Sequence, residues 1–382
     1  MFSPDSLSWL LLPLGIVLGW VSAMRMHAET GSQPTHDSEP TVDVALDAMS
    51  DDAITAIGRA ADANPALAEL QLTLGALFRR RGEVDRAIAV HERLHANTAL
   101  SNATRDDALY ELAQDYLKAG LMDRAEALLH ELINRTTHAE RGLELLLSTH
   151  EQTRDWQQAI DVARQLQGIK ARDFSNRLAH YHCELAEQVL DDDPIEARRL
   201  ARRSLDLCPA SVRASLLLGA IAEKLQDPIA ALHAYRRVPE QDARFLPEVI
   251  ASLERCSNAI HQPQMFVEFI EEAEQRLPQA GCVVLARARL IGQSQGDVMS
   301  YLAARLAQYP HWPGLLAWID AQSIAKTPAA AGLGALRDAL RKRLDSRPGY
   351  RCTHCGLTPG MLFWQCPSCK QWDSTIPDED RL

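Results

Sequence analysis

The feature that most restricts the fold is an alanine that returns at a nearly fixed period. Six short amphipathic segments carry it: "DDAITAI", "DRAIAVH", "DRAEALL", "QQAIDVA", "IEARRLA" and "IAALHAY". The shared alanines are Ala53, Ala87, Ala125, Ala159, Ala197 and Ala231. Successive gaps are 34, 38, 34, 38 and 34 residues, which is the period of tetratricopeptide helix pairs with four-residue insertions in two loops. A generic helical bundle would not keep its alanines at such a period.

Small and aromatic residues near these alanines also fit pairs of packed helices. Gly75, Ala113 and Gly219 let the first helix of a pair approach the second closely, and Phe78 and Tyr116 fill the space beside them. One pair cannot bury its apolar side alone, so the pairs must stack. The pattern is strong from about 66 to 244. Beyond about 245 the small residues are lost, but we still expect pairs of helices there.

We therefore expect an all-α fold, in which a tetratricopeptide-repeat solenoid spans 41–322 and a linker with a terminal helix spans 323–349. The composition agrees, because 46% of the residues are hydrophobic but only 5% are aromatic, which favours helices. The formal net charge of −11 argues against nucleic acid as a partner, since binding phosphates requires a basic surface. The curved face of such an array is expected to bind proteins.

The front of the chain has the character of a membrane anchor. Residues 6–24, "SLSWLLLPLGIVLGWVSAM", contain no charged side chain. As a helix they would reach about 28 Å, roughly the hydrocarbon thickness of a bilayer. A cleaved signal peptide is the alternative, but the preceding "MFSPD" lacks Lys and Arg. We expect a transmembrane helix within 1–25, inserted in membrane lipid, and a flexible linker at 26–40, with Arg25 placing the remainder in the cytosol.

The eight cysteines fall into two sets. Four stand singly and are expected to be small core hydrophobes: Cys183, Cys208, Cys256 and Cys282. The others form two Cys-x-x-Cys pairs within eighteen residues: Cys352, Cys355, Cys366 and Cys369. Two such turns aim four thiolates at one point, which predicts a metal-binding ribbon at 350–375, followed by an acidic tail at 376–382. We expect Zn2+, with iron as the less favoured alternative. Four thiolates leave no open position for water, so we do not expect an enzyme.

Two sequence features that involve cysteines allow more than one interpretation: the tryptophans beside the second pair, and a segment that ends at Cys183. Trp364 and Trp372 flank the second pair, and they either cover the metal site or dock the ribbon against the last helices. The segment "HYHC" at 180–183 resembles a metal motif. On a helix His180 and His182 point about 200° apart and cannot share one ion, so only His180 with Cys183 could do so.

Anchor, repeat array and four-cysteine ribbon together resemble the lipopolysaccharide assembly protein B family over nearly the whole chain. The most telling stretches are "LGALFRRRGEVDRAIAVHERL" (74–94), "ALYELAQDYLKAGLMDRAEALL" (108–129) and "YRCTHCGLTPGMLFWQCPSCKQW" (350–372). The resemblance implies a cytoplasmic adaptor on the inner membrane that restrains lipopolysaccharide synthesis. It also implies that a rubredoxin-like ribbon, with its metal on the four cysteines, packs on the array.

The partners that this resemblance implies are a membrane-bound AAA+ protease, the deacetylase of the committed step of lipid A synthesis, and an inner-membrane protein that senses lipopolysaccharide. The adaptor would present the deacetylase to the protease. Residues 26–40 depart from the family pattern, in which the anchor runs almost directly into a full first helix. Two alternatives are a tetratricopeptide scaffold for another membrane complex and a membrane-tethered, rubredoxin-like electron carrier.

Overall fold

The computed structural model describes residues 67–135, 138–169, 173–324 and 330–378. The expected anchor at 1–25, the linker at 26–40 and the repeat around Ala53 lie outside these residues. Among the helices that are described, none combines the length and apolar character needed to cross a bilayer. The chain divides into two compact units, Met1–Ala119 and Gly120–Leu382.

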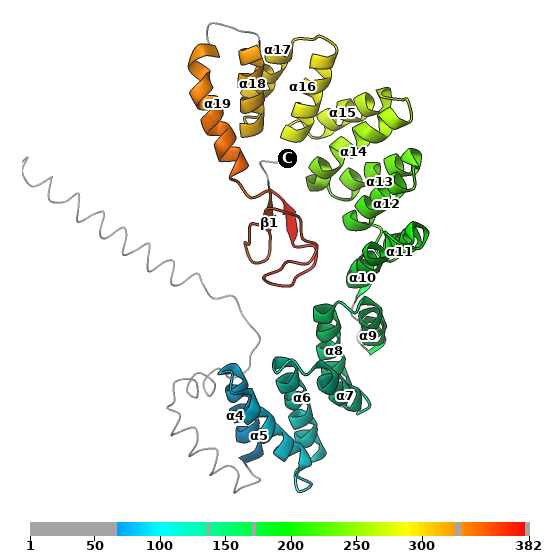
Figure 1. Ribbon diagram of the computed structural model, residues 1–382, viewed down its shortest axis with the longest axis vertical. Coiled ribbons are helices and arrows are strands. Elements are labelled where there is room, and N and C mark those ends of the chain that lie inside the picture. Colours follow the sequence, from blue (N-terminus) through cyan, green and yellow to red (C-terminus); the bar gives the residue numbers. More distant parts are fainter. Residues whose placement is uncertain (1–66, 136–137, 170–172, 325–329, 379–382) are drawn as a thin grey trace, which may run out of the picture. The chain divides into compact units, whose positions relative to one another are not determined.

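The described parts of both units are mainly helical (Figure 1). The helices of the first unit are α4 Ala68–Arg80, α5 Val84–Ala96 and α6 Asn102–Lys118. The second unit comprises α7 Met122–Ile133, α8 Ala139–Thr153, α9 Trp156–Ile169, α10 Ser175–Val189, α11 Pro194–Leu207, α12 Val212–Lys224, α13 Pro228–Gln241, the 3-10 turn η3 Ala243–Phe245, α14 Leu246–Ala259, α15 Gln264–Arg276, α16 Gly281–Gln293, α17 Val298–Gln308, α18 Trp312–Ile324, α19 Ala330–Asp345, and strands β1 Tyr350–Cys352 and β2 Thr375–Pro377.

The periodic alanines mark the second helix of each pair. Each of the described ones is the fourth residue of its helix and is 0% exposed: Ala87, Ala125, Ala159, Ala197 and Ala231. A larger side chain there would push the two helices of the pair apart, because protein interiors are close-packed. The helical repeat predicted from the spacing is therefore confirmed for these units.

Close approach also explains Gly75 and Gly219. A Cβ atom on Gly75 would lie 2.3 Å from Nε2 of His91, and one on Gly219 would lie 2.3 Å from Cε1 of Tyr235. Each glycine thus makes room for a side chain from the second helix of its own pair. The expectation that small residues allow the helices to pack closely is confirmed at both positions.

Left-handed turns connect the helices even where the glycine of the repeat pattern is absent. Gly82 follows α4 with φ of 83°, and Gly120 follows α6 with φ of 76°. Non-glycine residues take the same conformation in later turns: Arg154, Gln226, His261 and Gln295. The backbone geometry of the repeat therefore continues beyond residue 245, where the sequence pattern fades, and helices α14 to α19 continue as pairs.

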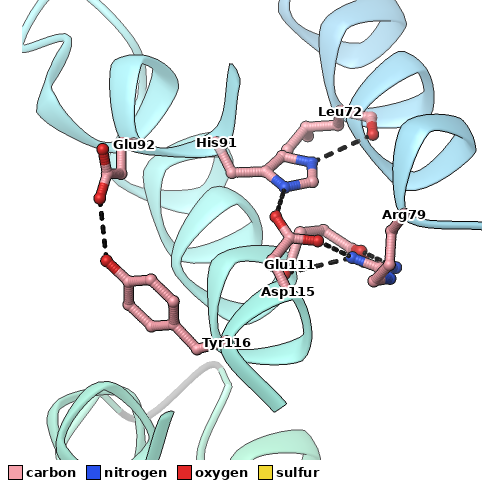
Figure 2. A network of polar contacts seen from close by, with 7 residues as sticks. All are labelled: Leu72, Arg79, His91, Glu92, Glu111, Asp115 and Tyr116. Atoms are coloured by element: carbon pink, nitrogen blue, oxygen red, sulfur yellow. Dashed lines mark hydrogen bonds and ion pairs between the residues drawn. The ribbon is translucent and has the colours of Figure 1, made fainter. Parts of the chain in front are cut away.

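A buried polar network fastens the first unit (Figure 2). His91 and Asp115 are both 0% exposed, and Nδ1 of His91 lies 2.5 Å from Oδ2 of Asp115. The second carboxylate oxygen of Asp115 accepts from Nη1 of Arg79 at 2.8 Å, and Arg79 also donates to Glu111 at 2.6 Å. The network joins α4, α5 and α6, and each buried charge has a partner of opposite charge.

Candidate metal centre

The ribbon consists of two short antiparallel strands joined by a long loop, and it carries two similar cysteine turns. Strand β1 pairs antiparallel with β2, with Cys352 opposite Thr375. The amide of Gly356 donates to the carbonyl of Cys352 at 3.0 Å, and that of Lys370 donates to the carbonyl of Cys366 at 2.9 Å. Gly356 and Lys370 have φ of 76° and 59°. From the sequence, Gly356 and Pro367 are the turn residues expected in the two pairs, but the positive φ of Lys370 is not predictable, since lysine rarely takes this conformation.

All four predicted ligands come together at one point. Their sulfur atoms lie within 4.8 Å of one another, with Sγ of Cys352 3.8 Å from that of Cys369 and Sγ of Cys355 3.7 Å from that of Cys366. Metal–sulfur bonds of about 2.3 Å in a tetrahedron give sulfur–sulfur edges of about 3.8 Å. The donor set therefore fits one tetrahedral ion. Among the residues that the structure describes, these four cysteines are the group of possible metal ligands that lies close enough together to hold an ion.

The surroundings of Cys352 favour a thiolate. Burial opposes ionisation of Cys352, which is 1% exposed, but its sulfur is hydrogen-bonded to the Ser374 hydroxyl over 3.3 Å. Together with the amides of His354 and Cys355, this bond lowers the pKa of Cys352 to about 6. Cys366 is equally buried, whereas Cys355 is exposed. The centre thus lies at the ribbon surface, with one side closed by the fold.

Trp372 docks the second cysteine turn on α9 and α10. Its ring stacks on His180 with centroids 4.7 Å apart and meets Trp156 and Tyr181 edge-on at 6.1 and 5.9 Å. The indole N–H donates to Oε1 of Glu151 on α8 at 3.1 Å. We call these four partners the docking face: Glu151, Trp156, His180 and Tyr181.

The next residue, Asp373, adds a polar contact to α10. Its Oδ2 accepts from Nδ2 of Asn176 at 2.8 Å and lies 2.8 Å from Nε2 of His180. Burial alone would raise the pKa of Asp373, but the bonds from His180 and Asn176 and the charge of Arg213 outweigh it and lower that pKa. The ribbon is therefore held by a charged contact as well as by aromatic stacking.

Two further contacts extend the attachment toward α14. Trp364 stacks on Phe245 of η3 with centroids 5.7 Å apart, and the guanidinium of Arg213 on α12 lies 6.0 Å from its ring centroid. The hydroxyl of Tyr350 donates to Glu248 on α14 at 2.9 Å. Both tryptophans therefore dock the ribbon. They do so on the middle helices, however, so the alternative that placed them against the last helices was wrong about the helices.

The structure also shows whether His180 and Cys183 of the "HYHC" segment can share a metal ion. Nε2 of His180 faces Asp373, while the sulfur of Cys183 donates to the Ser204 hydroxyl at 3.2 Å. The two side chains share no metal site, and burial raises the pKa of the Cys183 thiol to about 11. Cys183 and Cys256 are core residues as predicted, whereas Cys208 and Cys282 are only partly buried.

Some residues of the site were missed by sequence reasoning. Glu151, Asn176 and Asp373 each contribute a bond that joins ribbon and array, but the bonded partners lie 197 and 221 residues apart in the chain. No local motif marks such pairs. The ribbon is also slightly longer than expected, because Ile376 and Pro377, placed in the acidic tail, belong to β2.

The ribbon and the full chain are each similar to known proteins. Residues 350–377 match the family described as the rubredoxin metal binding domain. A solved tetratricopeptide repeat protein from Parabacteroides merdae is 12% identical, covers 72% of this chain and 97% of its own, and gives a TM-score of 0.34. Lipopolysaccharide assembly protein B of Escherichia coli (strain K12) is 30% identical over 380 residues, which is 97% of each chain. The Haemophilus influenzae protein of that name is 30% identical over 390 residues, covering 97% of this chain and 98% of its own. The chain belongs to the lipopolysaccharide assembly protein B family.

Proposed function

We propose that this chain is a membrane-anchored adaptor that regulates lipopolysaccharide biosynthesis. The observation that carries the proposal is its relationship to lipopolysaccharide assembly protein B along 97% of both chains, which takes in the repeat array as well as the ribbon. A stacked helical array offers a long surface for other proteins. The apolar, uncharged stretch at 6–24 supports an anchor in the inner membrane, with the array on the cytoplasmic side.

In this proposal the adaptor acts by raising local concentration. It binds the deacetylase of the committed step of lipid A synthesis and presents it to a membrane-bound AAA+ protease. An inner-membrane protein that senses lipopolysaccharide regulates the adaptor. Holding adaptor and protease on one bilayer turns a three-dimensional search into a local one, which raises effective concentration without any new contact. The chain itself carries out no reaction.

The proposed metal is Zn2+, held by Cys352, Cys355, Cys366 and Cys369. A closed shell of four thiolates supplies folding energy to a module too small to form a core. Other residues of the chain contact a metal ligand or attach the ribbon to the array. Ser374 is hydrogen-bonded to the sulfur of Cys352, and Trp364, Trp372 and Asp373 hold the ribbon on the array.

The test is to deplete the protein in cells and follow deacetylase turnover after protein synthesis is stopped. We expect the half-life of the deacetylase to lengthen several-fold and lipopolysaccharide to rise. The full chain should restore turnover, while a chain lacking residues 1–25 should not, although its array and ribbon are intact. Unchanged turnover on depletion would remove this proposal.

One observation favours a second candidate, a membrane-tethered electron carrier. Cys355 is exposed, which places the centre near the surface, as electron transfer between proteins requires. Metal analysis of the purified chain separates the two candidates. A colourless protein with about one zinc per chain supports the adaptor, whereas a red protein that bleaches on reduction supports the carrier.

A further inference from the structure

We propose that the ribbon is a metal-dependent latch: while the four cysteines hold their metal, the ribbon covers the docking face, and metal loss uncovers that face without unfolding the array. This inference concerns how the surface of the array is controlled. It does not depend on the part that the chain plays in lipopolysaccharide synthesis.

The first step is that the docking residues depend on the second cysteine turn for their positions. Trp364 precedes Cys366 by two residues, and Trp372 follows Cys369 by three. The amide of Asp373 donates to the carbonyl of Trp364 at 2.9 Å, and Gln365 pairs with Trp372 as an isolated bridge. The two tryptophans and Asp373 therefore lie on one loop, closed at its base by Cys366 and Cys369, while Tyr350 and Leu362 touch the array from other parts of the ribbon.

The second step is that the ribbon has little else to hold its shape. Strands β1 and β2 have three residues each. In the loop between them, the partly buried Leu362 and Trp364 pack against the core of the array rather than into the ribbon. Modules of this size fold only with a staple such as a metal. Without metal, Trp372 and Asp373 lose the geometry that presents them to α10.

The third step is that the docking face persists without the ribbon. Tyr181 stacks on Trp156 with centroids 5.8 Å apart, and its hydroxyl donates to Glu151 at 2.5 Å. Arg177 donates to the same carboxylate at 2.8 Å. These contacts lie within α8, α9 and α10. Departure of the ribbon thus leaves them in place and exposes an aromatic surface beside a carboxylate.

His180 offers a direct probe of this change. It is 1% exposed, and three ribbon residues lie against it: Trp364, Trp372 and Asp373. His182, on the same helix, is 7% exposed, and the charged groups near it are Arg164, Arg199 and Arg203 on the neighbouring α9 and α11. His130 on α7 has a side chain 60% exposed. The three histidines can be compared in one sample.

The experiment treats the full chain in detergent with diethyl pyrocarbonate, with its metal bound and after chelation, and follows each histidine by mass spectrometry. We expect modification of His180 to become at least about ten-fold faster after chelation, while that of His182 stays slow and that of His130 stays fast. Adding zinc back should restore the protection of His180. Protection of His180 after metal loss would overturn the latch, and so would joint labelling of His180 and His182, which would mean that the array unfolds.

A substitution tests the same latch without removing metal. In Trp372→Ala the four cysteines are intact, and the chain should still bind one metal ion. Labelling of His180 should nevertheless rise toward the rate of the chelated wild type. If this variant binds metal and His180 stays protected, Trp372 is not what covers the face, and the proposal fails.

Discussion

The indole N–H of Trp372 donates to Oε1 of Glu151 over 3.1 Å and so ties the cysteine turn to α8. The same oxygen accepts from the Tyr181 hydroxyl at 2.5 Å and from Arg177 at 2.8 Å. Burial and the adjacent Glu151 raise the pKa of Tyr181 far above its ordinary value, so its hydroxyl keeps its proton and remains a donor. One carboxylate therefore joins α8, α10 and the ribbon.

Replacing Glu151 by Gln tests this shared acceptor. The amide keeps the size of the side chain, but it removes the charge from three hydrogen bonds, and bonds to charged groups contribute about 1.5–3 kcal/mol each. We expect the variant to lose about 2 kcal/mol of stability in denaturant unfolding of the second unit. Glu126→Gln is the matched control, because Glu126 is 42% exposed and its pair with His130 at 3.5 Å is open to solvent. It should cost less than about 0.5 kcal/mol. Equal losses in both variants would contradict the role of Glu151.

The contact of Asp373 with His180 and Asn176 predicts a dependence on pH. The pKa of Asp373 is lower in the folded chain than in the unfolded chain. Its contribution to stability is therefore full above the unfolded pKa and is lost as the pH falls through the lower folded pKa. Because the Asp373 side chain is 43% exposed, solvent screening keeps this contribution below about 1 kcal/mol.

Asp373→Asn removes this titration and leaves the metal ligands unchanged. The melting temperature of the variant should lie below that of the wild type at neutral pH, and the gap should begin to close as the pH falls below about 4, the ordinary pKa of aspartate. Metal loss in acid affects both proteins alike, so only their difference is informative. A gap that persists or widens at low pH would show that Asp373 acts through something other than its charge.

The parts of the structure that the sequence predicted are those with local patterns. Ala159 and Ala197 are recognisable because each helix pair repeats the same packing within its own residues, and Cys352 and Cys355 because a metal turn fixes their spacing. Asp373 and Asn176 form their bond across 197 residues of sequence, so their pairing follows only from how the second unit folds. The sequence suggested, as one of two interpretations, that Trp364 and Trp372 dock the ribbon on helices, but no local pattern identifies the helices that they contact.

In the first unit, Asp115 is the residue on which the buried network depends (Figure 2). Asp115→Ala leaves Arg79 and His91 without their shared carboxylate, and breaking a buried ion pair from one side costs about 3–5 kcal/mol. We expect a loss of this size, measured by hydrogen exchange of α4 to α6 in increasing denaturant. Glu92→Gln is the control, because its bond from Tyr116 at 2.8 Å involves an exposed carboxylate. It should change stability by less than about 1 kcal/mol.

Gly219 and Gly168 lie in helices but differ in their surroundings. A Cβ atom on Gly219 would lie 2.3 Å from the Tyr235 ring, whereas one on Gly168 would have no neighbour within 4 Å. Gly219→Ala should therefore destabilise the second unit by about 1–3 kcal/mol through overpacking. Gly168→Ala should stabilise it by about 0.5–1 kcal/mol, because alanine favours the helix. Thermal unfolding followed by circular dichroism should show opposite shifts, and shifts of the same sign would contradict the close packing of α12 on α13.

The neighbouring residues Ser374 and Thr375 both carry a hydroxyl group, but only that of Ser374 contacts a predicted metal ligand. The Ser374 hydroxyl is hydrogen-bonded to Sγ of Cys352 at 3.3 Å and donates to the carbonyl of Gln371 at 3.0 Å, whereas Oγ1 of Thr375, which is 1% exposed, has no hydrogen-bond partner. Removing a group that orients and stabilises a ligand typically weakens metal binding about 10–100-fold. We therefore expect Ser374→Ala to weaken zinc binding about ten-fold in competition with a chelator. Thr375→Val, which keeps the shape of the side chain, should leave the affinity unchanged. If both variants bind zinc as the wild type does, the hydroxyl of Ser374 does not support the thiolate of Cys352.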